Sequence, residues 1–316
     1  MKYFHPKKYW RLIKEWSYNF FWYYIVPDSW YLKYRYKQVF GKPLNLKNPQ
    51  TFNEKIQWLK LYDRNPLYTK LVDKVAVKDW VKNRIGEEYI IPNLAVWNNV
   101  SQINWDMLPN QFVIKCNHDA ASYVICTNKT KLDITSAEIK LRSCLKTDYY
   151  RYENKQWAYK GIKRKILAEA FIKDSNDISI GLTDYKFFCF NGVVDCVMVS
   201  VDRHVGTPKF YFYDREWNIL RYNYRSIQLD EKFSLKKPTN FDKMWEIAEI
   251  LSAGIPFVRV DLYNCSGKIF FGEMTFYPDG GADANLLAET ELRFGNKLIL
   301  PNKKENNENY RISDIS

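Results

Sequence analysis

The chain has 316 residues, which favours about two domains, and its 46% apolar and 27% charged residues are ordinary for a folded protein in water. Its net charge of +12 indicates an acidic partner. Because no arginine-rich tract, zinc-finger spacing or RNP-like motif is present, we expect no nucleic acid and favour acidic carbohydrate or an anionic membrane. Six well-separated cysteines indicate a reducing compartment, and without a signal-peptide pattern or a spanning apolar segment the sequence predicts a cytoplasmic protein.

Residues 1–45 form a basic, aromatic arm. Within residues 1–43, lysines and arginines are mixed with tryptophans and tyrosines, and only Glu15 and Asp28 oppose their charge. A helical stretch of this kind is able to lie on the anionic inner face of the bacterial inner membrane. It is equally able to pack on the main body, and the sequence leaves both interpretations open.

Residues 46–110 are predicted to be a helical region that precedes the main lobes. Thr51 and Glu54 have the spacing of a capping box at the start of a helix. A second helix is expected over residues 73–84, because Gly86 and then Pro92 follow it.

Residues 111–180 are predicted to form a first lobe. The apolar runs 112–117 and 123–128 are expected to be strands joined by the loop 118–122. A helix is expected to begin near Thr135.

Residues 181–301 are predicted to form a second lobe made mostly of strands. Apolar, β-branched and aromatic runs alternate with turns such as Asn191-Gly192. A helix is expected over residues 241–253, where apolar side chains recur at helical spacing. The polar residues 302–316 are expected to be a flexible tail.

The segment 258–275 is predicted to be a β-hairpin. A three-residue loop with Gly267 in the left-handed position would place Asp261 opposite Phe271 and Arg259 opposite Glu273. Side chains alternate between the faces of a strand, so one face of the predicted hairpin is apolar and includes Phe270.

The other face of the hairpin would present Arg259, Asp261, Phe271, Glu273 and Thr275. Two carboxylates and a hydroxyl are oxygen donors of the kind that Mg²⁺ takes together with phosphate oxygens. A cross-strand ion pair on a solvated sheet explains the same residues without a metal. The glycine-rich turn that follows, residues 275–281, favours the metal site.

Several separated blocks, in this order along the chain, resemble one known family: TFNEKIQWLKL, FVIKCNH, DYKFFCFNG and RVDLY…GKIFFGEMTFYPDGG. They are similar to the TupA-like branch of the ATP-grasp ligases, which is associated with bacterial capsular and other surface polysaccharides. The resemblance covers roughly residues 45–300. It implies an α+β, ATP-grasp fold in which two α+β lobes clamp ATP between antiparallel sheets, with a helical N-terminal region.

The resemblance also implies a nucleotide site. Lys115 and Lys186 would reach the phosphates of ATP, and the loop with His118 and Ser122 would cover them. The loop departs from the family pattern, because residues 119–122 read Asp-Ala-Ala-Ser where a glycine-rich sequence is usual. A hinge would offer backbone groups to adenine, and its residues would be Glu169, Ala170 and Ile172.

The implied metal ligands for Mg²⁺ are Asp261, Glu273 and Thr275, the last in a position where the family often has Asn. Arg259 is expected to stabilise the oxyanion of a tetrahedral intermediate. Residues 202–204 and 279–281 are expected to line the acceptor site. There Arg203 would pair with a substrate carboxylate, and His204 would act as a base or be an ordinary surface histidine.

The implied activity is an ATP-dependent carboxylate–amine ligase that forms an amide through an acylphosphate. Its partners would be ATP, an acidic sugar such as a uronic acid in a capsular or teichuronic-type polysaccharide precursor, and an amine or amino-acid co-substrate. Two alternatives stay open at this point. One is a glycosyltransferase of polysaccharide biosynthesis, and the other is a non-catalytic protein that binds acidic glycan or membrane.

Overall fold

The computed structural model describes residues 17, 20–120, 122–173, 182–201 and 208–302. The predictions for residues 1–16, for Arg203 and His204, and for the tail from residue 303 onward lie outside the described residues. None of the helices in the described parts of the chain is long and apolar enough to cross a bilayer.

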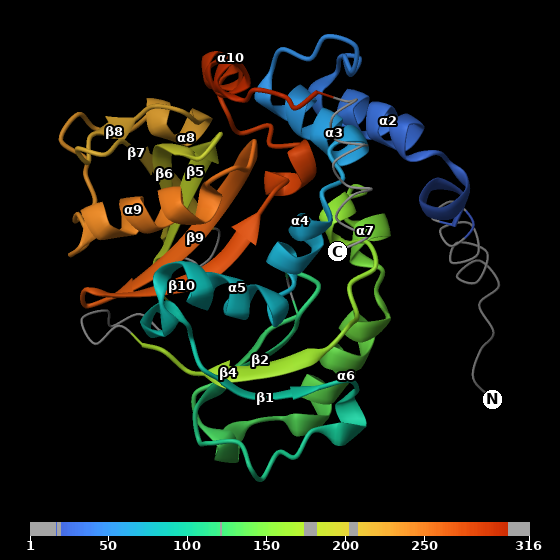
Figure 1. Cartoon of the computed structure of the whole chain (residues 1–316), viewed down its shortest axis with the longest axis vertical. Helices are drawn as coiled ribbons and strands as arrows, with labels where there is room; N and C mark the ends of the chain where they lie inside the picture. Colours follow the sequence, from blue (N-terminus) through green and yellow to red (C-terminus); the bar gives the residue numbers. More distant parts are fainter. Residues whose placement is uncertain (1–16, 18–19, 121, 174–181, 202–207, 303–316) are drawn as a thin grey trace, which may run out of the picture.

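Two antiparallel sheets form the framework, which confirms the predicted α+β fold (Figure 1). The first sheet has the strand order β1-β4-β2-β3. Its strands are β1 (Asn93–Trp97), β2 (Phe112–Cys116), β3 (Val124–Cys126) and β4 (Ile166–Ala170). The second sheet has the order β10-β9-β5-β6-β7-β8. Its strands are β5 (Asp184–Phe190), β6 (Val193–Val201), β7 (Lys209–Tyr213), β8 (Ile219–Leu220), β9 (Phe257–Cys265) and β10 (Lys268–Thr275).

The first sheet has a core of its own. Alternate residues of β2, such as Phe112 and Ile114, pack with Leu141 of α6 (Ile134–Lys146). Helix α6 begins near Thr135, as predicted, and its cap is Asp133, whose carboxylate accepts a hydrogen bond of 2.9 Å from the backbone N–H of Ser136. Strand β1 lies within the region predicted to be helical, and it pairs with β4 at the edge of this sheet.

The second sheet is covered on both faces. Neighbouring residues of β5 point to opposite sides of the sheet, so their contacts show what covers each face. Phe187 packs against Phe241 of α9 (Phe241–Ser252). Phe188 packs on the other side against Phe294 of α10 (Ala288–Lys297) and Phe52 of α3 (Phe52–Tyr62). Helix α3 begins with the predicted capping box of Thr51 and Glu54.

The remaining elements connect and flank the sheets. The predicted helix over residues 73–84 is α5 (Ala76–Ile85), and residues 73–75 form the turn before it, where the Asp73 carboxylate accepts hydrogen bonds from the N–H groups of Val75 and Ala76. The elements are η1 (Phe21–Ile25), α2 (Asp28–Phe40), α4 (Pro66–Val72), α5 (Ala76–Ile85), η2 (Glu87–Tyr89), η3 (Val100–Gln102), η4 (Lys129–Lys131), α7 (Tyr149–Tyr152), η5 (Trp157–Tyr159), α8 (Tyr224–Ile227) and η6 (Pro278–Gly281).

The described part of the N-terminal arm packs on the main body through α2. Tyr31, Leu32 and Tyr36 of this helix are buried with Leu44. Asp28 accepts a hydrogen bond from the hydroxyl of Tyr150 in α7, and its carboxylate lies 3.3 Å from the amine of Lys155. Over residues 28–40 the structure thus agrees with the interpretation in which the arm packs on the body.

Candidate functional site

The loop of the β9–β10 hairpin has two residues, so the three-residue loop predicted above is wrong. Ser266 and Gly267 both have positive φ angles, 53° and 91°, which is typical of a tight two-residue hairpin turn. Cys265 pairs with Lys268, and Leu262 consequently lies opposite Phe271. A loop one residue shorter shifts the partners along the strand, so the predicted pairs of Asp261 with Phe271 and Arg259 with Glu273 do not form.

A β-bulge at Gly272 then changes the register again. Beyond it Asp261 lies opposite Glu273, and Arg259 lies opposite Thr275. A Cβ atom at position 272 would be 2.9 Å from the carbonyl oxygen of Asp261, so the bulge requires glycine.

The shorter loop exchanges the predicted faces of the two phenylalanines, which both precede the bulge. Phe271 belongs to the main core with Leu262, and Phe270 packs with Tyr263 in a small separate cluster.

Asp261 is the centre of a buried charge network. Its carboxylate accepts two hydrogen bonds of 2.7 Å from Arg259, through Nε and Nη2. Lys186 lies opposite Asp261 on β5 and pairs with both Asp261 and Asp184. Burial alone would raise the pKa of Asp261, but Arg259 and Lys186 outweigh it, and the pKa is lowered. Asp261 is therefore an ionised carboxylate although its side chain is only 2% exposed.

Glu273 and Thr275 adjoin this network from β10. The Glu273 carboxylate is 37% exposed and lies 3.5 Å from Arg259 Nη2. The Thr275 hydroxyl accepts a hydrogen bond of 3.1 Å from the same nitrogen. Within the described residues no group of three or more His, Cys, Asp or Glu is arranged to hold a metal. The two facing carboxylates nevertheless fit a hard cation that takes its other ligands from phosphate and water.

A second charged cluster lies on the first sheet, on the face away from α6. Glu169 of β4 is buried, and its carboxylate pairs with Lys115 of β2 and, at 2.5 Å, with Lys78 of α5. Burial would raise the pKa of Glu169, but Lys115 and Lys78 lower it overall. Lys78 and Lys74 were not predicted as site residues. Their four-residue spacing, which puts them on one side of a helical turn, is the sequence signal that could have found them.

Lys74 connects this cluster with the second sheet. Its amine donates to the carbonyl oxygen of Asp119 in the predicted phosphate loop. Burial lowers the pKa of Lys74, while the negative charges of Glu273, Asp119 and Glu169 oppose that change. Lys74 thus lies within electrostatic reach of the loop, the first sheet and the hairpin. Figure 1 shows α5 between the first sheet and the hairpin.

The predicted phosphate loop is held by its own side chains. The Ser122 hydroxyl accepts from the N–H of Cys116 at 2.7 Å and donates to the carboxylate of Asp119. His118 is 2% exposed, and neither of its ring nitrogens has a hydrogen-bond partner in the described part of the chain. Burial lowers the pKa of His118, so the ring is neutral near pH 7.

The predicted hinge lies beside an apolar cluster that joins the two sheets. The N–H of Ala170 donates to the carbonyl of Pro92 at 3.0 Å, so this donor is already used. Ile172 and Ala170 pack with residues at the end of the hairpin. The buried members of the cluster are Ile91, Cys265 and Phe270.

Helix α3 holds the glycine-rich turn that follows β10. The Gln57 side-chain amide donates to the carbonyl of Gly281 at 2.6 Å, and the buried amine of Lys60 donates to the carbonyl of Gly280 at 2.7 Å. Both glycines have positive φ, and a Cβ atom on either would lie 2.7 Å from a neighbouring side chain. Asn53 exchanges hydrogen bonds with the backbone of Asp283. The TFNEKIQWLKL block therefore positions the residues after the turn.

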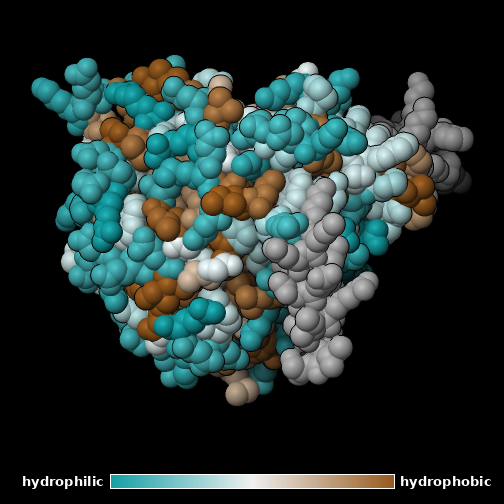
Figure 2. Space-filling view, turned by 45° about the horizontal axis from the view of Figure 1, so that its top comes forward, coloured by the Kyte–Doolittle hydropathy of each residue, from teal (hydrophilic) through white to brown (hydrophobic). Residues whose placement is uncertain are grey.

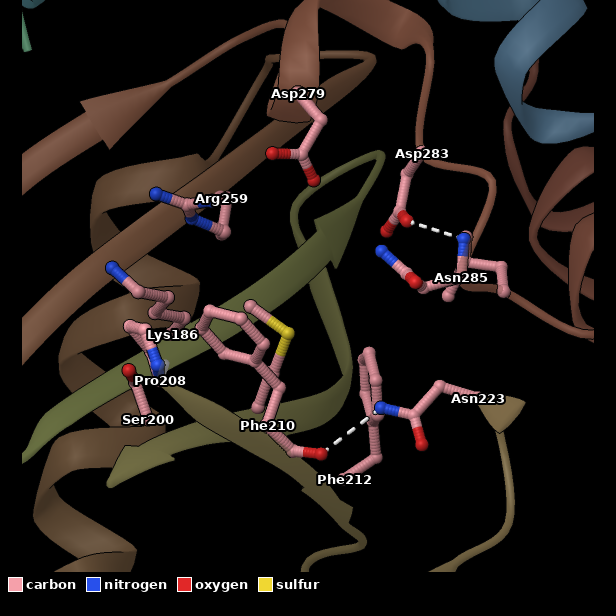
Figure 3. A pocket seen from close by; sticks show the side chains of 12 residues that line it. Lys186, Ser200, Pro208, Phe210, Phe212, Asn223, Arg259, Asp279, Asp283 and Asn285 are labelled. Atoms are coloured by element: carbon pink, nitrogen blue, oxygen red, sulfur yellow. Dashed lines mark hydrogen bonds between the residues drawn. The ribbon is translucent and has the colours of Figure 1, made fainter. Parts of the chain in front are cut away.

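A cavity of about 220 Å³ adjoins the Asp261 network (Figure 3). Lys186 and Arg259 form one side of it. Another side is formed by Asp279, within the turn held by α3, and by Asp283 and Asn285, which follow that turn. Arg203 and His204, predicted for an acceptor site, lie outside the described residues.

The fold consists of two antiparallel sheets, and each sheet carries a cluster of paired carboxylates and cations. The family model described as TupA-like ATPgrasp matches residues 54–299, and the chain belongs to this family. It is accordingly an ATP-dependent carboxylate–amine ligase in general terms.

Solved structures with a similar fold include two D-alanine–D-alanine ligases. The one from Bacillus anthracis complexed with ATP is 14% identical, with a TM-score of 0.45, over 76% of this chain and 67% of that chain. The one from Helicobacter pylori is 11% identical, with a TM-score of 0.39, over 78% and 69%. The ATP-grasp ligase PsnB complexed with a minimal precursor is 9% identical, with a TM-score of 0.35, over 71% and 60%. Among curated proteins none matches the chain.

Proposed function

We propose that this ligase joins an amine to the carboxylate of an acidic sugar, such as a uronic acid, in a precursor of a bacterial surface polysaccharide. The observation that carries the proposal is the presence of one charge cluster on each sheet, Lys115–Glu169 on the first and Lys186–Asp261–Arg259 on the second. The net charge of +12 favours an anionic sugar substrate.

Three lysines would bind the triphosphate of ATP. Lys115, Lys74 and Lys78 bring positive charge to one face of the first sheet; Glu169 holds Lys115 and Lys78 in place, and the Asp119 carbonyl holds Lys74. Glu169 is one carboxylate among three lysines, and the negative charge of the phosphates would balance the remaining positive charge. His118 and Ser122 lie in the adjoining loop, and adenine would lie on the apolar cluster that contains Ala170 and Ile172.

Asp261 and Glu273 would hold Mg²⁺, and Thr275 would supply a further oxygen. When bound, Mg²⁺ neutralises charge on the phosphates during transfer to the substrate carboxylate. Arg259 donates three hydrogen bonds within the network, which fix its guanidinium beside the cavity. From there it would stabilise the negative oxygen that forms when the amine attacks the acylphosphate.

The test is product analysis with purified protein, ATP, Mg²⁺ and a panel of uronic acids and amines. ADP and phosphate should form only when both a carboxylate and an amine are present, and hydroxylamine should trap the acylphosphate as a hydroxamate. Formation of AMP and pyrophosphate would contradict the acylphosphate route. Membership of the ligase family favours this activity over a glycosyltransferase. If a nucleotide sugar raised the Tm of the protein and ATP did not, the glycosyltransferase would be favoured instead.

Contact with an anionic membrane is a second part of the proposal. Phe21, Ile25 and Trp30, near the start of the described chain, are 50%, 60% and 69% exposed. On the face shown in Figure 2, by contrast, hydrophobic surface is divided into small patches among hydrophilic residues. Sedimentation with phosphatidylglycerol vesicles tests this contact. Binding should be lost when Phe21 and Trp30 are replaced by serine, and equal binding to neutral vesicles would argue against it.

A further inference from the structure

The cavity beside Arg259 has two chemically different ends. Lys186 and Arg259 at one end are already paired with Asp184, Asp261 and Glu273. At the other end Asp279 and Asp283 have no lysine or arginine within ion-pair distance among the described residues. Figure 3 shows both carboxylates directed into the cavity. The uncompensated charge of the cavity is therefore negative.

A buried hydroxyl is also without a partner. Ser200 of β6 is 1% exposed, lines the cavity, and has no hydrogen-bond partner for its Oγ atom within the described residues. An unpaired buried hydroxyl is costly, and a ligand group can satisfy it. Figure 3 shows this oxygen on the same side as Lys186, with the side-chain amide of Asn285 directed inward from across the cavity.

The walls and the size of the cavity limit the ligand further. Met198, Phe210 and Phe212 supply apolar surface between the polar ends. A volume of about 220 Å³ gives room for one small polar molecule, such as a small amine or a monosaccharide.

We propose that this cavity holds the amine co-substrate of the ligase, and that it selects an amine with no carboxylate beside the amino group, such as an amino alcohol or an amino sugar. The assignment rests on the proposed function. An ammonium group would lie between Asp279 and Asp283, and hydroxyl groups would bond to Ser200 and Asn285. An α-amino acid would bring its own carboxylate toward two others, which is unfavourable.

The same arrangement supplies a base. One oxygen of Asp283 accepts from the N–H of Asn285 at 2.9 Å, and the second is available for a proton. Burial and the nearby charge of Asp279 raise the pKa of Asp283, which suits it to accept a proton from a bound ammonium group.

The neutral nitrogen then attacks the acylphosphate carbon and forms the C–N bond. The bond from that carbon to the phosphate oxygen breaks, and inorganic phosphate leaves. The second proton lost by the nitrogen goes to the phosphate.

The experiment measures thermal stability of the full chain with Mg²⁺ and a non-hydrolysable ATP analogue. Ethanolamine and D-glucosamine should raise the Tm, whereas the matched compounds glycine and N-acetyl-D-glucosamine should not. Asp279→Asn and Asp283→Asn should each weaken the binding of both amines by about tenfold or more. Glu289→Gln, an exposed substitution nearby on α10, should have no effect.

The inference is overturned if neither amine shifts the Tm, if glycine stabilises as well as ethanolamine does, or if the Asp279 and Asp283 variants bind like the wild type. Hydroxylamine separates this failure from failure of the proposed function. It is uncharged near neutral pH, so the Asp283→Asn variant should still form the hydroxamate while losing ligation to ethanolamine. Absence of any hydroxamate with the wild type would count against the ligase proposal, and the Tm measurement would still decide the amine site.

Discussion

Replacement of Asp261 by Asn should abolish activity and also destabilise the fold, whereas Glu273→Gln should affect activity alone. Asp261 is 2% exposed and pairs with two cations, Arg259 and Lys186. Removal of one partner from a buried ion pair typically costs 3–5 kcal/mol. We expect about 3 kcal/mol here, because Lys186 keeps Asp184 and Arg259 keeps Glu273 as partners.

Glu273→Gln is the matched control. Its carboxylate is 37% exposed and lies 3.5 Å from Arg259, so this ion pair is worth no more than about 1 kcal/mol. Both variants remove one carboxylate from the same pair of opposed strands, and both should lose the stabilisation that Mg²⁺ and an ATP analogue give to the wild type. Only Asp261→Asn should unfold at markedly lower urea concentration in the absence of ligands.

Urea denaturation of the two variants, each with and without Mg²⁺ and nucleotide analogue, makes the comparison. The midpoint of Asp261→Asn should fall while the slope stays constant, because the surface exposed on unfolding is the same. Equal midpoints for the two variants would refute the view that Asp261 neutralises buried cations. Normal activity in either variant would show that the carboxylates hold no metal.

Three further predictions concern residues outside this network. Burial raises the pKa of Glu291 from 4.5 to about 7, so its contribution to stability is complete below pH 4.5 and is lost as the pH rises through 7. Glu291→Gln should therefore stabilise the protein at pH 8 by up to about 3 kcal/mol and not at pH 4.5, and an equal effect in urea titrations at both pH values would contradict this. Lys60→Met removes the donor to the carbonyls of Gly280 and Asn154. It should raise the KM for the amine and lower the free energy of unfolding by roughly 1–3 kcal/mol. An unchanged KM for the amine would show that the turn needs no support from α3. Lys115→Met should raise the KM for ATP by about tenfold or more in steady-state kinetics. Lys131→Met, at an exposed position, is the control. Equal KM values for ATP in the two variants would exclude Lys115 from the phosphate site.

Local signals in the sequence predicted local structure well. The capping box of Thr51 and Glu54 is confirmed, and so are the strands of the second sheet, such as β5, which is buried along its whole length because both faces of the sheet are covered. The grouping of Arg259, Asp261 and Glu273 on one face was also predicted correctly, although the predicted register was wrong. The loop is one residue shorter than expected, and the bulge at Gly272 shifts the register by one more residue in the same direction. The total shift of two residues returns the side chains beyond the bulge to the predicted face.

Contacts between distant segments could not be predicted from patterns. Lys78 lies in a helix of ordinary amphipathic appearance and Lys74 in the turn before it, and only the packing of α5 over the first sheet brings them near Glu169. The role of Lys60 was hidden for a similar reason. A lysine is usually exposed on a helix, and nothing in the sequence shows that two carbonyl groups more than 90 residues away accept hydrogen bonds from it.

The two sheets have separate hydrophobic cores, and this separation constrains how the protein can move. The first sheet packs with α6, whereas α3, α9, α10 and the second sheet share the larger core. A rigid rotation of the first sheet would leave both cores intact. It would have to break the contacts of Lys78 with Glu169 and of Lys74 with Asp119, and these polar contacts weaken as salt is added. It would also have to part Ala170 and Ile172 from Cys265 and Phe270 in the small apolar cluster between the sheets. The ease with which the molecule opens to admit its nucleotide should therefore rise with ionic strength, up to the limit set by this one apolar contact.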